Sequence, residues 1–489
     1  MNRFGRRQLL LGGALGAASV AIPGRAAAVA GPAAAVWDYP EHRSAAQLEA
    51  DSAYAARQVE ALSSARGRER AGQILDRLQA RQDVAPGPHG VPFDRYRPPG
   101  SGTEVLVARG QLTVRMDQPD AASPAGAAAR LASLGYTRAG HTSPRQASGA
   151  PARPRTGVFH AGKEPAQLAR DAARLRAQGI DAAMNVVVPL GHVIKADDYP
   201  LPTRGWGPPP AVTPAAVRVA LVDTGLAAGA RGDGWLNDAV AGPGHADPLD
   251  MLPPVGRLDW GAGHGTFTAG IVRRVAPRCE IVAYRFTRGD GLGTDADVAD
   301  MLLQAAQDAH RAGIPTVINA SLGTPAADGV PPPAMRAAVE FIGANHPEVL
   351  IVASAGNMGS AEPMFPAAFD GVVAVGALTH DLRAAPFSSH GPWLRCSTVG
   401  VGVVSTYVPG VSPPEPDPDH PDRVFGADAW ALWSGTSFSA PQISGAVARL
   451  CCDQPGLSPH AALDMLLADR PQLPGYGRVL RLLPGTPAA

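Results

Sequence analysis

The strongest constraint on this chain is a series of short apolar segments that alternate with helix-length amphipathic segments in its second half. Five segments are rich in β-branched residues and apolar on both faces, which is typical of strands buried in a parallel sheet. They cover residues 217–222, 280–286, 316–320, 349–353 and 372–375. Between them, His264–Val275, Asp295–Ala312 and Pro333–Asn345 are long enough to be crossover helices. We therefore expect one three-layer α/β domain with a mainly parallel buried sheet over residues 215–489.

A chain of 489 residues is too long for a single domain of ordinary size. Before residue 215 it lacks the long series of apolar strands and helix-length amphipathic segments seen in the second half. Six prolines in residues 200–214 indicate a linker, because proline continues neither a helix nor a central strand. Residues 103–199 alternate strand and helix patterns, which predicts a small α+β module with two short strands at 104–107 and 111–115. Residues 31–102 show helical spacing only at 45–82 and carry no enzymatic motif, so we expect one or two helices there and little other order.

The first thirty residues have the layout of a secretory signal. Arg3, Arg6 and Arg7 precede a 14-residue apolar run at 9–22, and small residues end in Ala28-Val29-Ala30. A membrane anchor is the alternative, but the run is shorter than the roughly 20 residues of a bilayer span. The segment Gly5-Arg6-Arg7-Gln8-Leu9-Leu10 resembles a twin-arginine signal. We expect residues 1–30 to direct secretion, and the processed protein to form no stable membrane association.

Composition excludes several classes of function. Lys+Arg and Asp+Glu both number 43, and no block of like charge could follow a phosphate backbone, so nucleic acid is not an expected partner. The only lysines, Lys163 and Lys195, precede the α/β domain. Because the domain itself contains no lysine, lysine-dependent chemistry is excluded there. The four cysteines, Cys279, Cys396, Cys451 and Cys452, lack the spacing of a metal site. Two alternatives stay open: a disulfide between Cys279 and Cys396, or buried free thiols.

Four polar residues stand where an open α/β sheet gathers catalytic groups, at strand carboxyl ends and helix amino ends. Asp223 ends the first apolar strand, and His264 opens the first helix. Asn357 follows the strand at 349–353, and Ser437 opens a later helix. Serine nucleophile chemistry needs a hydroxyl, a base, an acid that orients the base, and donors for the oxyanion. Each residue alone also has a structural explanation, as a cap, a turn residue or a buried histidine.

Taken together, five motifs in chain order resemble the subtilisin-like serine proteases, or subtilases. They are Asp-Thr-Gly at 223, Gly-His-Gly-Thr around His264, Ser-Leu-Gly at 321, Ala-Gly-Asn at 355 and Gly-Thr-Ser-x-x-Ala-Pro at 435. The resemblance implies a subtilisin-like fold for residues 215–489 and an endopeptidase that hydrolyses extended polypeptide. It requires no cofactor, and we expect a monomer.

The same resemblance implies a role for each matching residue. Ser437 would attack the scissile carbonyl, His264 would take and return its proton, and Asp223 would orient the imidazole. Asn357 and the Ser437 N–H would hold the oxyanion. The substrate walls would be Ser321, Leu322 and Gly323 on one side, which bind by β-addition, and Ser354, Ala355 and Gly356 on the other.

Further expectations concern maturation and calcium. The module at 103–199 resembles the propeptides of this family, which help the protease fold and plug its cleft, so the chain's own propeptide is an expected partner. We expect cleavage in the linker, at about 199–215. Phe267 replaces a second histidine of many relatives, and the segment after Gly270 is too short for their strong calcium site. We expect no assigned metal site; Asp417 and Asp419 leave weaker calcium binding open.

Three other readings compete with an active subtilase. The first is a catalytically silent subtilase fold used for binding, although all four catalytic positions are intact. An esterase or lipase would need Gly-x-Ser-x-Gly and the order Ser, Asp, His, which this chain lacks. A metallopeptidase is disfavoured because no His-Glu-x-x-His occurs.

Overall fold

The computed structural model describes most of the chain. The described residues are 36–37, 39, 41–84, 90–100, 103–117, 124–139, 152–190, 199–251, 254–287, 291–413 and 422–488. The expected signal at 1–30 and the acidic residues Asp417 and Asp419 lie outside them.

A nine-stranded sheet forms the centre of the second half, in the order β21-β22-β16-β15-β13-β11-β7-β9-β8. Every neighbouring pair is parallel except β21 with β22. The strands are β7 (Arg218–Asp223), β8 (Val240–Ala241), β9 (Glu280–Arg285), β11 (Thr316–Ala320), β13 (Val349–Ser354), β15 (Val372–Leu378), β16 (Cys396–Val399), β21 (Gln472–Leu473) and β22 (Gly477–Val479). The expected parallel sheet is confirmed, and its central strands β11 and β13 are buried along their whole length, as their mainly apolar sequences predict.

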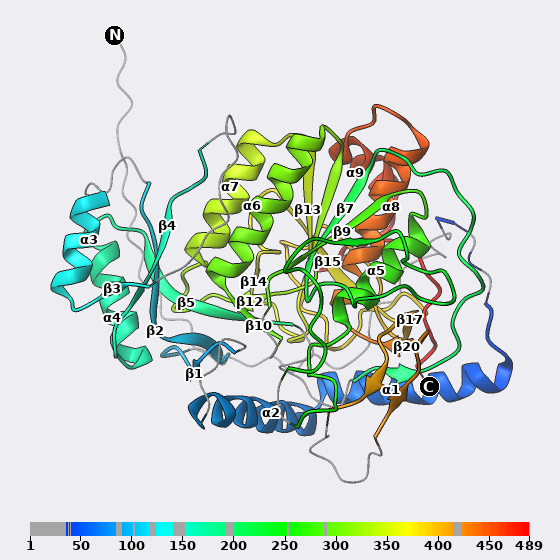
Figure 1. Cartoon of the computed structure of the whole chain (residues 1–489), viewed down its shortest axis with the longest axis horizontal. Helices are drawn as coiled ribbons and strands as arrows, with labels where there is room; N and C mark the ends of the chain where they lie inside the picture. Colours follow the sequence, from blue (N-terminus) through cyan, green and yellow to red (C-terminus); the bar gives the residue numbers. More distant parts are fainter. Residues whose placement is uncertain are drawn as a thin grey trace.

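Helices cover both faces of this sheet. Figure 1 shows α6 (Asp295–Ala312) and α7 (Pro333–Asn345) on one side, and α5 (His264–Val275), α8 (Ala440–Asp453) and α9 (Pro459–Leu467) on the other. The bounds of α5, α6 and α7 are those that the sequence predicts. Their ends are locally encoded: Thr294 and Asp297 form a capping box at the start of α6, and Gly313 ends it at φ 64°.

A second sheet, which is antiparallel, forms the centre of the upstream module. Its six strands have the order β10-β5-β2-β4-β3, with β1 beside β2, so β10 (Leu292–Thr294) from the second half of the chain joins it. The module also contains α3 (Pro124–Ser133) and α4 (Pro165–Arg176). The strands are β1 (Phe93–Tyr96), β2 (Val105–Arg115), β3 (Thr137–Arg138), β4 (Thr156–His160) and β5 (Ala182–Pro189). The expectation of two short strands at 104–107 and 111–115 is wrong: β2 is continuous. Gly110, at φ 68°, lets the strand bend without ending.

Two helices and the linker pack against these units. Helices α1 (Ala45–Ser63) and α2 (Ala65–Val84) run along the lower edge in Figure 1, with α1 beside β20 (Trp430–Trp433). The linker adds β6 (Leu201–Pro202), which pairs with β20, and β17 (Val403–Thr406) pairs with β20 on its other side. The Trp206 ring lies 5.1 Å from that of Trp430 and 5.6 Å from that of Trp235. The linker is therefore packed against the domain as far as Trp206, whereas residues 210–214 are exposed.

Short elements complete the described fold. They are β10 (Leu292–Thr294), β12 (Thr324–Pro325), β14 (Met364–Phe365), β18 (Gly410–Val411), β19 (Val424–Phe425) and the 3₁₀ helix η1 (Thr436–Phe438). All four cysteines are free and buried, so the structure has the buried thiols and no bridge between Cys279 and Cys396. No helix in the described ranges has the length and apolar character of a membrane span.

Candidate active site

The carboxyl edge of the central sheet brings together the four predicted catalytic residues. Asp223 is the last residue of β7, and Asn357 lies in the loop after β13. His264 is the first residue of α5, and Ser437 is the middle residue of η1. Parallel strands end at one edge, so the loops that follow them converge there.

Asp223 and His264 form a buried pair. The Asp223 Oδ1 lies 2.7 Å from His264 Nδ1, and both side chains are fully buried. The carboxylate is also fixed by the Thr224 N–H, which donates to Oδ1 at 2.7 Å, and by the Thr268 hydroxyl, which donates to Oδ2 at 3.3 Å. The remaining ring nitrogen of His264, Nε2, therefore points away from the carboxylate, as an oriented general base requires.

Two features of the chain set the direction of His264. Gly263 has φ 80°, and a Cβ there would lie 2.7 Å from the Tyr407 ring, so glycine lets the chain turn tightly into α5. The imidazole packs beside Trp433 and Phe438, with ring centroids 5.7 and 5.5 Å away. Phe438 follows Ser437 directly, so the nucleophile loop lies against the imidazole. Phe267 fills this aromatic cluster, with its ring centroid 4.6 Å from that of Phe438.

Ser437 is tied to one predicted substrate wall. Its hydroxyl donates to the Ser321 carbonyl at 3.3 Å, and the Ser321 hydroxyl donates to the Ser437 carbonyl at 2.8 Å. Ser437 stands at the start of the helical segment that continues into α8, where free N–H groups favour a developing negative charge.

The Asn357 side chain is held through its oxygen. Oδ1 accepts from the Thr436 N–H and from the Thr436 hydroxyl, both at 2.9 Å. This leaves the amide NH₂ as the group that Asn357 can offer to a substrate oxygen. The Thr436 hydroxyl accepts in turn from the Gly356 N–H at 3.1 Å, so one side chain links the oxyanion candidate to the second wall.

Asp247 is a site residue that sequence reasoning missed. Its Oδ2 accepts from the Thr224 hydroxyl at 2.9 Å and from the Gly263 N–H at 2.8 Å. It therefore braces the residues next to both Asp223 and His264. Burial raises the pKa of Asp247 to about 6, and the nearby Asp223 charge adds to that rise. No motif surrounds Asp247 in the sequence, so only its position in the fold reveals it.

The two predicted walls lie next to each other. The Ser354 hydroxyl donates to the Leu322 carbonyl at 3.4 Å, which joins the segment 321–323 to the segment 354–356. Ala355 N–H donates to Val375 O at 2.9 Å, so the second wall is anchored to the sheet. All six predicted wall residues thus belong to segments that adjoin the Ser437 loop.

The end of the upstream module lies along the first predicted wall. Strand β5 pairs antiparallel with β10, in the register Leu292↔Pro189, Gly293↔Val188 and Thr294↔Val187. The next residue, Leu190, forms an antiparallel bridge with Leu322. The chain is described again from Tyr199, whose ring lies 6.2 Å from that of Trp433, the neighbour of His264. An extended segment therefore lies between two edges that an extended peptide would use.

Among the described residues, one group of His, Cys, Asp or Glu side chains has metal-ligand proximity: His310, His346 and Glu348. Glu348 directly precedes β13, so the group lies at the amino edge of the sheet, opposite the catalytic residues. Nδ1 of His310 and of His346 lie 3.3 and 3.2 Å from Glu348 Oε1. The buried Nε2 of His346 has no hydrogen-bond partner there, which favours a proton on Nδ1 that donates to Glu348. The trio is a hydrogen-bonded link between α6, α7 and β13.

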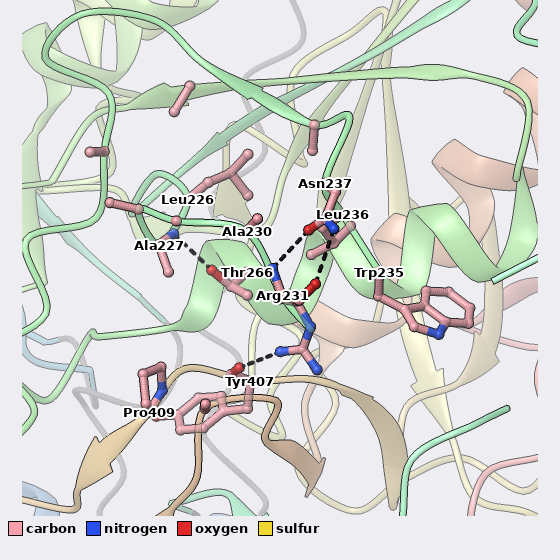
Figure 2. A pocket seen from close by; sticks show the side chains of 16 residues that line it. Leu226, Ala227, Ala230, Arg231, Trp235, Leu236, Asn237, Thr266, Tyr407 and Pro409 are labelled. Atoms are coloured by element: carbon pink, nitrogen blue, oxygen red, sulfur yellow. Dashed lines mark hydrogen bonds between the residues drawn. The ribbon is translucent and has the colours of Figure 1, made fainter. Parts of the chain in front are cut away.

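A cavity of about 510 Å³ lies beside α5, as Figure 2 shows, and none of the predicted site residues lines it. Its single charged side chain, Arg231, is engaged by Asp233 at 2.7 Å and by the Tyr407 carbonyl at 2.8 Å. Thr266 Oγ1 accepts from the Ala227 N–H at 3.1 Å and fixes the loop after β7 to α5. The cavity borders the support of the site and adds no reactive group.

Comparisons with known proteins give a consistent family. The model of the subtilase family, peptidase S8, matches residues 215–477. The thermophilic serine proteinase of Bacillus sp. (strain AK1) is 32% identical over 214 residues, which are 42% of this chain and 44% of that protein. Subtilisin DY of Bacillus licheniformis is 30% identical over 257 residues, which are 50% of this chain and 80% of that protein. The crystal structure of a lanthipeptide protease is 23% identical, with a TM-score of 0.40, and the match covers 54% of this chain and 85% of that one. The chain belongs to the subtilase family of serine proteases.

Proposed function

We propose that the protein is a secreted endopeptidase that hydrolyses peptide bonds of extended polypeptides through Asp223, His264 and Ser437. The observation that carries this proposal is the buried 2.7 Å contact between Asp223 and His264 beside the Ser437 loop. The orientation of Asn357 by Thr436 supports its assignment as an oxyanion donor.

The proposed reaction follows from these positions. The Ser437 Oγ attacks the scissile carbonyl while His264 Nε2 takes the hydroxyl proton, and the buried Asp223 carboxylate stabilises the imidazolium. The oxyanion receives hydrogen bonds from the Asn357 amide and the Ser437 N–H. His264 then protonates the leaving amine as the C–N bond breaks. A water molecule repeats the cycle on the ester, which releases the acid and restores Ser437.

We propose further that the enzyme is made as a pro-enzyme, with residues 103–190 as the inhibitor. The support is the path of the chain: β5 pairs with β10, and Leu190 bridges Leu322 in the expected substrate groove. Leu190 and Tyr199 flank the catalytic residues, whereas the linker packs against β20. We therefore propose that the cleavage that matures the enzyme lies between Leu190 and Tyr199. This position precedes the linker, in which the sequence pattern predicted the cut. Amino-terminal sequencing of the mature enzyme tests this, and a start at or after Leu201 would contradict it.

The competing proposal is a subtilase fold that binds without hydrolysis and keeps its upstream module. No observation at Asp223, His264, Asn357 or Ser437 favours it over the enzyme. Export by the twin-arginine-like signal and function as a monomer without a required cofactor belong to the main proposal. Cell fractionation and gel filtration test the first two.

Hydrolysis of an unfolded protein substrate tests the main proposal. Ser437→Ala should abolish hydrolysis and leave the chain full length, because no other hydroxyl takes the place of the nucleophile. Ser439→Ala is the matched control: Ser439 is buried in the same loop, but its hydroxyl donates to the Thr398 carbonyl at 3.2 Å. It should retain activity. Hydrolysis by the Ser437→Ala protein would refute the proposed nucleophile.

A further inference from the structure

We propose that helix α1 stays on the peptidase domain after maturation, as a second, non-covalent chain, and that Gln58 is a positioning residue for the nucleophile loop. This inference rests on the proposed cleavage between Leu190 and Tyr199. Cleavage there would separate α1 from Ser437 in the covalent chain, and the proposal includes a second cut between α1 and the inhibitor, without which the two would leave together. The contacts of α1 then decide whether the helix leaves with the inhibitor.

An apolar core joins α1 to the peptidase domain. Tyr54, Ala55 and Leu62 of α1 are 4, 0 and 0% exposed. They belong to one cluster with side chains from the other side of the proposed cut, which are Trp235, Ala377, Ala385, Phe387, Val401, Val404, Trp430 and Leu432. Removal of α1 would return this apolar surface to water, so the hydrophobic effect opposes its release.

A polar network closes over the beginning of α1. Arg43 Nη1 donates to Asp51 Oδ2 at 3.0 Å and to Thr486 Oγ1 at 2.7 Å, and the Arg43 and Asp51 side chains are 2 and 0% exposed. Asp51 also accepts from the Thr203 hydroxyl at 2.9 Å. Thr203 and Thr486 both lie beyond the proposed cut. These side chains are arranged for a lasting contact between the two chains.

Gln58 connects α1 to the nucleophile loop. Its side chain is fully buried, and its Oε1 accepts from the Ser434 hydroxyl at 2.7 Å. The Ser434 hydroxyl accepts in turn from the Gly402 N–H at 2.9 Å. Ser434 directly follows β20 in the stretch that leads into η1, and Ser437 follows three residues later. Gln58 therefore fixes the approach to Ser437, and its Nε2 also donates to the Leu432 carbonyl at 3.4 Å and to the Tyr199 carbonyl at 3.5 Å.

The inhibitor module has the opposite relation to activity. Its strand β5 and Leu190 lie on the substrate edges β10 and Leu322, so substrate and module compete for the same place. The polar contacts of α1 fall on the Tyr199 carbonyl, β20 and Ser434, and those of Arg43, just before α1, fall on Gly485 and Thr486. An active enzyme must therefore lose the module, whereas it gains from keeping α1.

The test begins with wild-type enzyme that has matured to constant activity. Active sites are titrated with a fluorophosphonate, the enzyme is gel filtered, and its chains are identified by denaturing mass spectrometry. We expect two chains in equal amounts, one with labelled Ser437 and one that contains residues 45–63 but not residues 124–190. Labelled, active enzyme without residues 45–63 would overturn the inference and leave the proposed function standing. Unlabelled Ser437 in an uncut chain would overturn both.

Substitutions on one helix test the positioning role. Gln58→Met keeps the side-chain volume but removes the acceptor of Ser434, and we expect kcat to fall about tenfold with KM within about twofold. Glu60→Gln on the exposed face of α1 is the matched control and should change neither constant. An unchanged kcat in correctly folded Gln58→Met enzyme, or equal losses in both variants, would overturn the role of Gln58.

Discussion

The Thr436 hydroxyl provides a graded test of how the oxyanion donor is held. Thr436→Val preserves shape but removes the bond from Oγ1 to Asn357 Oδ1, while the backbone bond at the same 2.9 Å distance remains. One of two orienting bonds is lost, which corresponds to about 1 kcal/mol, and Gly356 N–H also loses its acceptor. We expect kcat to fall about five- to twentyfold. Asn357→Ala, which removes the donor itself, should cost about 10²- to 10³-fold.

The assay is steady-state hydrolysis of a chromogenic peptide, with enzyme concentration set by active-site titration. Thr316→Val is the matched control, since Thr316 is equally buried but lies at the amino edge of β11. Because Thr436 acts through Asn357, the double variant should be scarcely slower than Asn357→Ala alone. Losses that multiply in the double variant, or a Thr436→Val loss as large as that of Asn357→Ala, would refute this reasoning.

Three further outcomes follow from the described contacts. Gly265→Ala should reduce activity more than tenfold and lower the free energy of unfolding by about 1–3 kcal/mol, because a Cβ would lie 2.0 Å from the Gly225 carbonyl and push α5 away from Asp223. The control is Gly343→Ala in α7, where a Cβ would have nothing within 4 Å. Equal effects of the two substitutions would contradict this reasoning. Burial raises the pKa of Asp295 to about 6, from 3.8. Its contribution to folding stability should therefore be complete below pH 3.8 and fall as the pH rises through 6, because the folded state keeps a proton that the unfolded chain releases. In urea unfolding, the free energy of unfolding should depend less steeply on pH in Asp295→Asn than in the wild type. The same pH dependence in both proteins would refute the assignment. Burial raises the pKa of the Cys279 and Cys396 thiols to about 12, and all four cysteines are buried. A thiol reagent should therefore label no cysteine before denaturation. Rapid labelling of the native enzyme would contradict this prediction.

Local sequence determined the central elements because their burial leaves a clear pattern. Strands covered on both faces, such as β11 and β13, are mainly apolar along their length, and α6 carries its own start and stop signals. Asp223, His264, Asn357 and Ser437 could be chosen as candidates from the sequence because each lies at or just after a strand end, or at a helix start, within a recognisable motif. Chemistry and topology point to the same positions there.

The remaining features depend on contacts between distant parts of the chain. Asp247 braces the site from a loop without a motif, and Gln58 reaches Ser434 from a helix that reads as an ordinary amphipathic segment. The continuity of β2 depends on Gly110, whose Cβ would meet the Ala161 carbonyl at 2.2 Å. The choice between free thiols and a bridge is set by where β9 and β16 place the cysteines. Such pairings become visible only when the tertiary structure is known.

The most direct test of the central claim is the intact mass of the purified protein before and after reaction with a fluorophosphonate, for wild type and Ser437→Ala. The account predicts that the wild type is cut between Leu190 and Tyr199 and gains one adduct, which peptide sequencing locates on Ser437, while the Ser437→Ala protein stays uncut and unmodified. A wild type that stays full length and unlabelled after the groove has been freed of the module by limited proteolysis would contradict the enzyme, and would leave a subtilase fold used for binding.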